Sequence, residues 1–138
     1  MKKVTTHYKV SIVDINYGGH MGNDKALTIF NEARINFLEY FGYSELSIGG
    51  DVGIILSEAN IKFRKEVLHQ DELDVEVWIT NMEGVRFTLN YRAIRRSDNI
   101  EVFNGTTLLV SFNYKTRKIS PIPQEFLAAT FEEDNFKG

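Results

Sequence analysis

The sequence of 138 residues has no cysteine, no long apolar run and little net charge, and each absence excludes a class of protein. Without cysteine there is neither a disulfide framework nor thiolate chemistry, which fits a reducing compartment. Residues 1–7 lack the apolar core of a signal peptide, and no segment approaches the length of a membrane span. We therefore expect a cytoplasmic protein that has no membrane partner.

The formal net charge of -3 gives no general attraction to nucleic acid, so no nucleic-acid partner is expected. His7, His20 and His69 are scattered, without the spacing of a metal site. No glycine-rich phosphate loop or dinucleotide fingerprint is present either, so we expect neither a metal nor a cofactor. The length and the hydrophobic content of 43% are those of one globular domain spanning residues 1–138.

Residues 25–41 have the pattern of one long helix. Ala26, Phe30, Ala33 and Phe37 recur every three or four residues, which places them on one face. Asn23 or Asp24 is a natural N-cap, because short polar side chains accept hydrogen bonds from the first free N–H groups. Gly42 is the expected residue just beyond the C-terminal end.

Most of the remaining chain has the alternation of long strands. Strands are expected over residues 8–13, 52–66, 72–81, 85–96 and 101–114, and a short helix over 124–131. Residues 97–99, Ser-Asp-Asn, have the composition of a turn and predict a hairpin. The pattern predicts an α+β fold with an antiparallel five-stranded sheet. One helix cannot cover such a sheet, so we expect a second subunit to cover the rest.

The segment DINYGGHMGN at residues 14–23 gathers polar groups directly before the long helix. A carboxylate, two amides, a glycine pair and a histidine meet the N-terminal end of that helix there. The first N–H groups of a helix have no intrahelical partner, and they can stabilise a developing oxyanion. This segment is the strongest candidate for a site.

The order of motifs resembles the hotdog fold, and in particular the 4-hydroxybenzoyl-CoA thioesterase-like branch of acyl-CoA thioesterases. That branch typically reads D-x-D-x-x-G-H-x-N-N and then has a helix containing E-A-R. Residues 14–23 resemble the first motif, and residues 32–34 are E-A-R. Residues 61–64 (IKFR) and 116–123 (TRKISPIP) resemble the later strands, so the likeness runs from about residue 8 to 127.

The resemblance implies a hotdog fold in which the five-stranded sheet wraps around one long central helix. It implies an acyl-CoA or acyl-carrier thioester as substrate, and a homodimer or homotetramer. The implied pocket lies at the dimer interface, between the N-terminal end of the helix and the partner's strands.

Two positions depart from the family pattern. The second Asp of the motif is the catalytic carboxylate in much of the family, but here it is Asn16, and an amide is neither a base nor a good nucleophile. Asn16 could orient a carbonyl or a water, or it could simply hold a turn. A position that is often Asn is Gly22. Asp14 could supply the missing carboxylate, or it could hold backbone N–H groups of the loop.

His20 and Glu32 are the other catalytic candidates. His20 could polarise the substrate or carry a proton, or it could be a structural hydrogen-bonding residue. Glu32 lies between Phe30 and Ala33, so it could be a partly buried base like the helix acids of a related branch. The alternative is that Glu32 forms a structural ion pair with a cation such as Arg34.

Four residues are candidates for substrate binding. Gly19 could allow close approach, or it could only serve the turn. Asn23 and Asp24 could present helix N–H groups to an oxyanion, although an Asp at this position more often caps the helix. Arg64 could bind the phosphates of coenzyme A, as could a second group of basic residues, namely Arg92, Arg95 and Arg96.

Three functions remain open at this point. The first is a thioesterase that hydrolyses an acyl-CoA or acyl-carrier thioester, with Glu32 or Asp14 replacing the absent acid. The second is a non-catalytic protein that binds an acyl thioester, which the amide of Asn16 favours. The third is a hotdog dehydratase using Gly19-His20 and Glu32, but that branch carries prolines between the two groups and this sequence has none there.

Overall fold

The computed structural model describes residues 2–131. It contains one long helix, one short helix, a 3-10 turn and six strands. In chain order these are β1 (Val4–Lys9), η1 (Ile12–Asp14), α1 (Lys25–Tyr40), β2 (Val52–Phe63), β3 (Glu72–Glu83), β4 (Arg86–Arg95), β5 (Ile100–Asn113), β6 (Lys118–Ile119) and α2 (Gln124–Thr130). No helix in this part of the chain is long and apolar enough to span a membrane.

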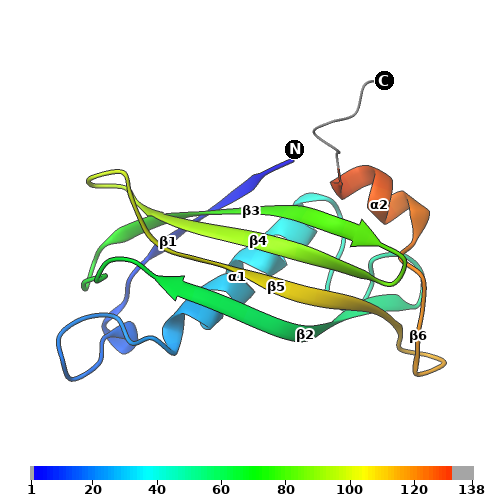
Figure 1. Ribbon diagram of the computed structural model, residues 1–138, viewed down its shortest axis with the longest axis horizontal. Helices are drawn as coiled ribbons and strands as arrows, with labels where there is room; N and C mark the ends of the chain where they lie inside the picture. Colours follow the sequence, from blue (N-terminus) through cyan, green and yellow to red (C-terminus); the bar gives the residue numbers. More distant parts are fainter. Residues whose placement is uncertain (1, 132–138) are drawn as a thin grey trace.

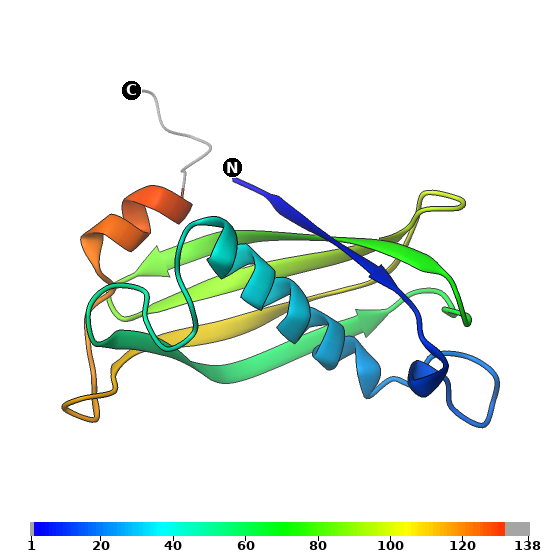
Figure 2. The ribbon, with the colours of Figure 1, turned by 180° about the vertical axis from the view of Figure 1, so that it is seen from behind.

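The strands form one antiparallel sheet in the order β1-β3-β4-β5-β2, with β6 beside the end of β5. Figure 1 shows the sheet in front, and Figure 2 shows α1 lying across its other face. The expected α+β class and antiparallel pairing are confirmed. The expected number of five strands is wrong, because β6 adds a sixth strand of only two residues.

The helix is held by an aromatic contact with the middle of the sheet. The ring of Phe30 stacks on that of Tyr91 with centroids 4.2 Å apart, and it lies 5.6 Å from the ring of Phe103. All three side chains are buried. The face of α1 with helical spacing, which includes Ala26, Ala33 and Phe37, therefore packs on the inner face of the sheet as expected.

The C-terminal end of α1 follows the prediction closely. Gly42 has φ +87°, a left-handed conformation that glycine adopts without a steric penalty. Its N–H donates to the carbonyl of Glu39, and the N–H of Tyr43 donates to that of Leu38. These two bonds are a Schellman motif, which satisfies carbonyl groups that the helix leaves free.

The beginning of the chain differs from the prediction. The expected strand over residues 8–13 starts earlier, at Val4, and ends at Lys9. Ser11 and Asp14 then form a capping box, in which the Ser11 side chain accepts from Val13 N–H and the Asp14 carboxylate from Ser11 N–H. Local side-chain bonds of this kind compete with strand pairing and turn the chain into η1.

Strand β2 is an edge of the sheet, and its register changes along its length. Leu56 pairs with Leu109 and Glu58 with Leu108, so Ser57 is the extra residue of a β-bulge. Beyond Ile54 the outer side of this strand has no partner among the described residues. Strand β2 is therefore an open edge of the sheet, and β1 forms the opposite edge.

We predict that Gly105→Ala destabilises the fold by about 1–3 kcal/mol, the usual cost of overpacking. Gly105 lies in β5 beneath α1 and has an ordinary φ. A glycine is required there because neighbouring atoms leave no room for a side chain, and not because of the backbone conformation. An added Cβ would collide with the carbonyl of Asn60 and lie 2.8 Å from Cε2 of Phe30. Urea unfolding measures the change. Thr106→Ala is the control in the same strand, and equal stability of the two variants would contradict the prediction.

Candidate functional site

Residues 14–22 form a short antiparallel ribbon that precedes α1. Ile15 pairs with Met21, and the N–H of Asn16 donates to the carbonyl of His20 over 2.9 Å. Met21 is buried in the core, whereas Asn16 is exposed and His20 half-buried. One face of the ribbon is therefore apolar and anchored, and the other presents the polar residues of the motif.

The tip of the ribbon explains its glycines. The carbonyl of Asn16 accepts from Gly19 N–H over 3.1 Å, and its side-chain oxygen accepts from Gly18 N–H over 2.8 Å. Gly19 has φ +86°, which favours glycine. Asn16 thus holds a turn through its side chain, which was one of the two roles predicted for it. Tyr17 stands fully exposed at the tip.

Asp14 is buried and committed to its surroundings. Its carboxylate accepts a hydrogen bond of 2.6 Å from the hydroxyl of Tyr8 and one of 2.8 Å from Ser11 N–H. Burial, followed by the hydrogen bond and charge of Asp14 and the charge of Glu32, raises the pKa of Tyr8 to about 12. Asp14 therefore holds the start of the ribbon, which was its alternative role.

His20 lines an open hollow of about 230 Å³ between the ribbon, the end of β2 and β5. Its Nδ1 lies 3.2 Å from the carbonyl of Met21. Because a carbonyl only accepts, this contact requires a proton on Nδ1, and in the neutral ring Nε2 is then the acceptor. Nε2 lies 3.9 Å from a carboxylate oxygen of Glu66. Glu66 also lines the hollow, together with Met21, Asn23, Phe63, Arg64, Lys65, Val67 and Phe103.

The backbone before α1 supplies free donors next to this hollow. The N–H groups of Lys25 and Ala26 donate to the carbonyls of Gly22 and Asn23. Within residues 2–131, the N–H groups of Asn23 and Asp24 have no acceptor. Both residues are exposed, and the positive end of the helix dipole lies at the same place. Free donors at this point can stabilise an oxyanion.

Asp24 occupies the predicted N-cap position but does not act as a cap. Its backbone is helical, with φ -67° and ψ -17°, whereas an N-cap typically has extended backbone. Its side chain makes no capping hydrogen bond. The expectation that a polar side chain caps α1 is therefore wrong.

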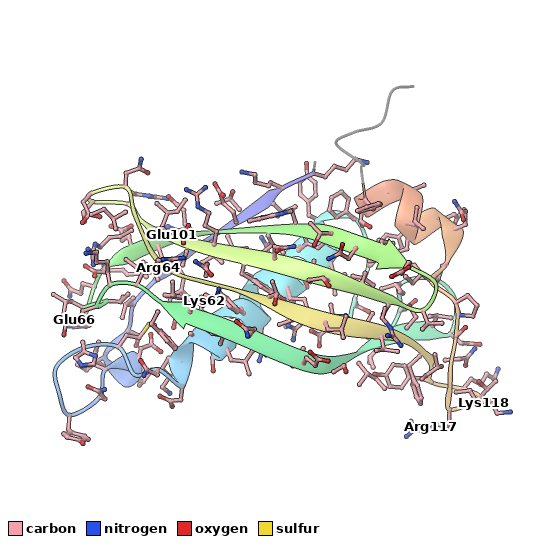
Figure 3. The ribbon with its side chains drawn as sticks, viewed as in Figure 1. Lys62, Arg64, Glu66, Glu101, Arg117 and Lys118 are labelled. Carbon is pink, nitrogen blue, oxygen red and sulfur yellow. The ribbon has the colours of Figure 1, made fainter. Side chains whose placement is uncertain are left out.

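Arg64 lines the hollow together with His20 and Asn23. Figure 3 shows Arg64 near Glu101 at one end of the sheet, and its Nε is 3.3 Å from Oε2 of that residue. Its side chain is 56% exposed, which leaves the guanidinium accessible to a ligand. The structure thus brings together His20, Asn23 and Arg64 from segments far apart in the sequence.

The other arginine group is already paired with carboxylates. Arg92 contacts Glu101 over 2.8 Å, Arg95 contacts Asp98 over 3.0 Å and Arg96 contacts Asp74 over 2.8 Å. The Arg96 guanidinium holds the pKa of Asp74 below its usual range. These pairs neutralise the group, and none of the three arginines lines the hollow.

Glu32 lies away from the hollow. Its charge acts on Tyr8 of β1, and Asn36, one turn later on the helix, donates to Thr6 of β1 over 2.7 Å. This flank of α1 therefore faces β1 and not the open edge at β2. Glu32 is also exposed, so the expected burial between its apolar neighbours is wrong. No ion pair between Glu32 and Arg34 occurs within the described residues.

Arg34 instead forms a buried polar network on the opposite flank of α1. It donates to Glu45 over 2.7 Å, to Asn31 over 2.7 Å and to the hydroxyl of Tyr91 over 3.2 Å. The Tyr91 hydroxyl also shares a hydrogen bond of 2.7 Å with Thr107. Burial opposes the charge of Arg34, but Tyr91 and Glu45 outweigh it and raise the pKa of the guanidinium. This arginine fixes the helix to the sheet.

Two residues of the site were missed by the sequence prediction. Tyr8 is the partner of Asp14, but no known motif spacing links a strand residue to an acid six positions later. Glu66 approaches His20 from the loop after β2, held there by the hydrogen bond from Met21 N–H to Val67 O over 2.7 Å. Only the end of the IKFR segment, two residues earlier, pointed to this loop.

The chain matches a family model. The model is described as the thioesterase-like superfamily, and it matches residues 10–130. The chain belongs to this superfamily, so the resemblance drawn from residues 14–23 and 32–34 is confirmed. A comparison with curated proteins gave no match.

Solved structures confirm the hotdog fold. The 1,4-dihydroxy-2-naphthoyl-CoA thioesterase Slr0204 from Synechocystis superposes with a TM-score of 0.83 at 24% identity, covering 93% of this chain and 95% of that one. A gentisyl-coenzyme A thioesterase gives 0.80 at 21% identity, covering 91% and 98%. YbaW, a probable thioesterase from Escherichia coli, gives 0.81 at 19% identity, covering 91% and 94%.

We predict a loss of stability at high pH that depends on Tyr8. Its pKa is about 12 in the folded chain against an ordinary value of 10.0. Below pH 10 the phenol is protonated in both states, so its contribution is fully present. As the pH rises toward 12, the unfolded chain loses the proton and the folded chain keeps it, so the free energy of unfolding falls.

Urea unfolding at a series of pH values measures this fall. Tyr8→Phe should show a shallower decline above pH 10 than the wild type. Tyr17→Phe, at the exposed tip of the ribbon, is the control and should keep the wild-type decline. Identical curves for wild type and Tyr8→Phe would show that Tyr8 is not the titrating group.

Proposed function

We propose that this protein is a thioesterase that hydrolyses an acyl-CoA or acyl-carrier thioester. The observation that carries the proposal is the open hollow in which His20 and Arg64 meet the free N–H groups before α1. Membership of the thioesterase-like superfamily also supports thioester hydrolysis. The 1,4-dihydroxy-2-naphthoyl-CoA and gentisyl-CoA thioesterases described above share the fold.

In the proposed reaction the thioester carbonyl lies beside the N-terminal end of α1. Water attacks the carbonyl carbon, and the N–H groups of Asn23 and Asp24 receive the negative charge on the oxygen. The carbon–sulfur bond then breaks, leaving a carboxylic acid and a thiol. In the neutral ring with the proton on Nδ1, Nε2 of His20 can accept a hydrogen bond from this water and position it. Gly19 keeps the turn tight, and Asn16 holds its tip.

A second copy of the chain completes the site in this proposal. The edge strand β2 is open, and it carries apolar side chains that water should not favour, since Leu56 is 38% exposed and Phe63 46%. An apolar patch next to an unpaired edge is typical of a subunit interface. Two β2 edges related by a two-fold axis pair antiparallel and bury these residues together.

Such pairing would also bring positive charge to the hollow. In Figure 3 Lys62 and Arg64 lie at one end of the sheet, and Arg117 and Lys118 at the other. Antiparallel pairing of two β2 edges turns the second end of one copy toward the first end of its partner. Basic side chains from both copies then suit the phosphates that coenzyme A and the phosphopantetheine arm of a carrier share.

A second function is favoured by one observation, the amide of Asn16. It stands where much of the family has its catalytic carboxylate, and its oxygen is engaged with Gly18 N–H. A protein that keeps the pocket without the acid would bind an acyl thioester without hydrolysing it. A dehydratase is not favoured, because Glu32 does not line the hollow.

We predict that the protein sediments as a dimer or larger species, above the 15.9 kDa of one chain. Leu56→Arg places a charge in the proposed interface and should give single chains at micromolar concentration. Ile100→Arg is the control, because Ile100, the first residue of β5 next to the β4–β5 turn, is exposed to a similar extent, 39%. A wild type that sediments as one chain would refute the proposed dimer.

We predict that the wild type hydrolyses at least one member of a series of acyl-CoAs from acetyl to palmitoyl, extended with benzoyl-CoA. His20→Ala should lower kcat/KM by about 10²-fold, the scale of lost proton transfer or positioning. His7→Ala, on β1 away from the hollow, is the matched control. Binding of acyl-CoA without release of free thiol would instead identify a binding protein.

A further inference from the structure

Gly22 lies between Asn16 and the start of α1. A glycine is needed at this position because a side chain would collide with a neighbouring group. Its φ is outside the left-handed region, so any residue could adopt its backbone conformation. An added Cβ, however, would lie 2.6 Å from Oδ1 of Asp24 and 3.9 Å from the Cβ of Asn16. Gly22 therefore leaves the room that the Asp24 carboxylate occupies.

The ribbon places this carboxylate with the polar residues of the motif. Side chains alternate along a two-stranded ribbon, so Asp14, Asn16, His20 and Gly22 share one face, and Ile15 and Met21 share the other. Because Gly22 has no side chain, the Asp24 carboxylate fills its place on the polar face. A carboxylate therefore lies close to Asn16, the position at which much of the family carries its catalytic Asp.

The Asp24 carboxylate is also free to react. It makes no hydrogen bond or ion pair within residues 2–131, and it does not cap the helix beside it. It is exposed, and the residue before it, Asn23, lines the hollow. The free N–H groups of Asn23 and Asp24 lie in the same turn of chain, so a base and an oxyanion site are adjacent.

We propose that Asp24 is the catalytic carboxylate of this protein and replaces the acid that much of the family carries at the position of Asn16. This inference rests on the proposed thioesterase function. Asp24 takes a proton from a water whose oxygen bonds to the thioester carbonyl carbon. The tetrahedral oxyanion then collapses, the carbon–sulfur bond breaks, and the proton passes from Asp24 to the departing thiolate. Water and thioester become acid and thiol, and Asp24 is regenerated.

The other acids near the site fit this role less well. The Asp14 carboxylate is buried and bonded to Tyr8 and Ser11. Glu32 lies on the β1-facing flank of α1. Glu66 also lines the hollow, but its carboxylate lies 3.9 Å from Nε2 of His20 on the loop after β2, not in the turn of chain that carries the free N–H groups.

The test compares variants of the full chain on the acyl-CoA series and on the matching pantetheine thioesters. Asp24→Asn should lower kcat by about 10²-fold or more on both substrate sets, the scale of general-base catalysis. Stability should hardly change, because the carboxylate bonds to nothing in the described fold. Asp51→Asn is the control at an exposed acid outside the ribbon, and it should retain the wild-type kcat.

Two further variants separate a base from a merely local role. Gly22→Ala keeps Asp24 but displaces its carboxylate, so kcat should fall while the fold, checked by urea unfolding, is retained. Asp24→Asn combined with Asn16→Asp moves the acid to the position used in much of the family. This double variant should recover at least tenfold of the activity that Asp24→Asn loses, together with the acidic limb of the pH–rate profile.

The outcomes distinguish the two proposals. An active wild type whose Asp24→Asn variant keeps full kcat overturns the role of Asp24 and leaves the thioesterase function standing. Loss of activity in Glu66→Gln or Glu32→Gln alone, with Asp24→Asn active, assigns the base to that residue instead. A wild type that hydrolyses no thioester overturns the thioesterase function and this inference together.

Discussion

The position of α1 on the sheet depends on one close contact, the ring of Phe30 laid on Tyr91 over the bare backbone of Gly105. A stacked aromatic pair fixes both distance and rotation more tightly than aliphatic contact does. Rotation of the helix decides which residues face β1 and which face β2. The Phe30–Tyr91 contact therefore determines on which flanks of α1 Glu32 and Arg34 lie. It also determines where the first turn of the helix presents its N–H groups.

The two flanks of α1 are consequently different in chemistry. The flank toward the start of β2 carries the buried cation Arg34, whose donors are satisfied by Glu45, Asn31 and Tyr91. A buried charge is tolerated only with such partners, and removing one leaves an uncompensated group. The flank toward β1 carries the weaker bond from Asn36 to Thr6. The stronger attachment thus lies beside the edge that we propose pairs with a second copy.

Patterns of short range were predicted well from the sequence. The apolar spacing and Gly42 placed the helix within one residue, over 25–41 against Lys25–Tyr40, and the alternation located the four long strands. Asn16 and His20 were recognised as candidates because their motif is contiguous, and Arg64 because an arginine suits phosphate. The two-residue β6 as a paired strand and the turn at Ile12–Asp14 escaped the prediction, since a capping box and a very short strand leave no periodic signal. The flank on which Glu32 lies escaped it too, because helical rotation is set by packing.

The bulge at Ser57 has a consequence for how the sheet could grow. An edge strand with a bulge is not uniform along its length, so only a restricted register lets its hydrogen-bonding groups meet those of another chain. Pairing of β2 with the β2 of a second copy leaves neither β2 free, so the assembly closes as a dimer. Pairing of β2 with the β1 of another copy would leave an unpaired β1 and β2 at the two ends, and further copies could add without limit. The opposite edge is short, since the six residues of β1 cover only part of β3. Strand β2 can therefore pair with the β2 strand of a second copy, while its bulge and the short β1 edge make open-ended fibres unfavourable.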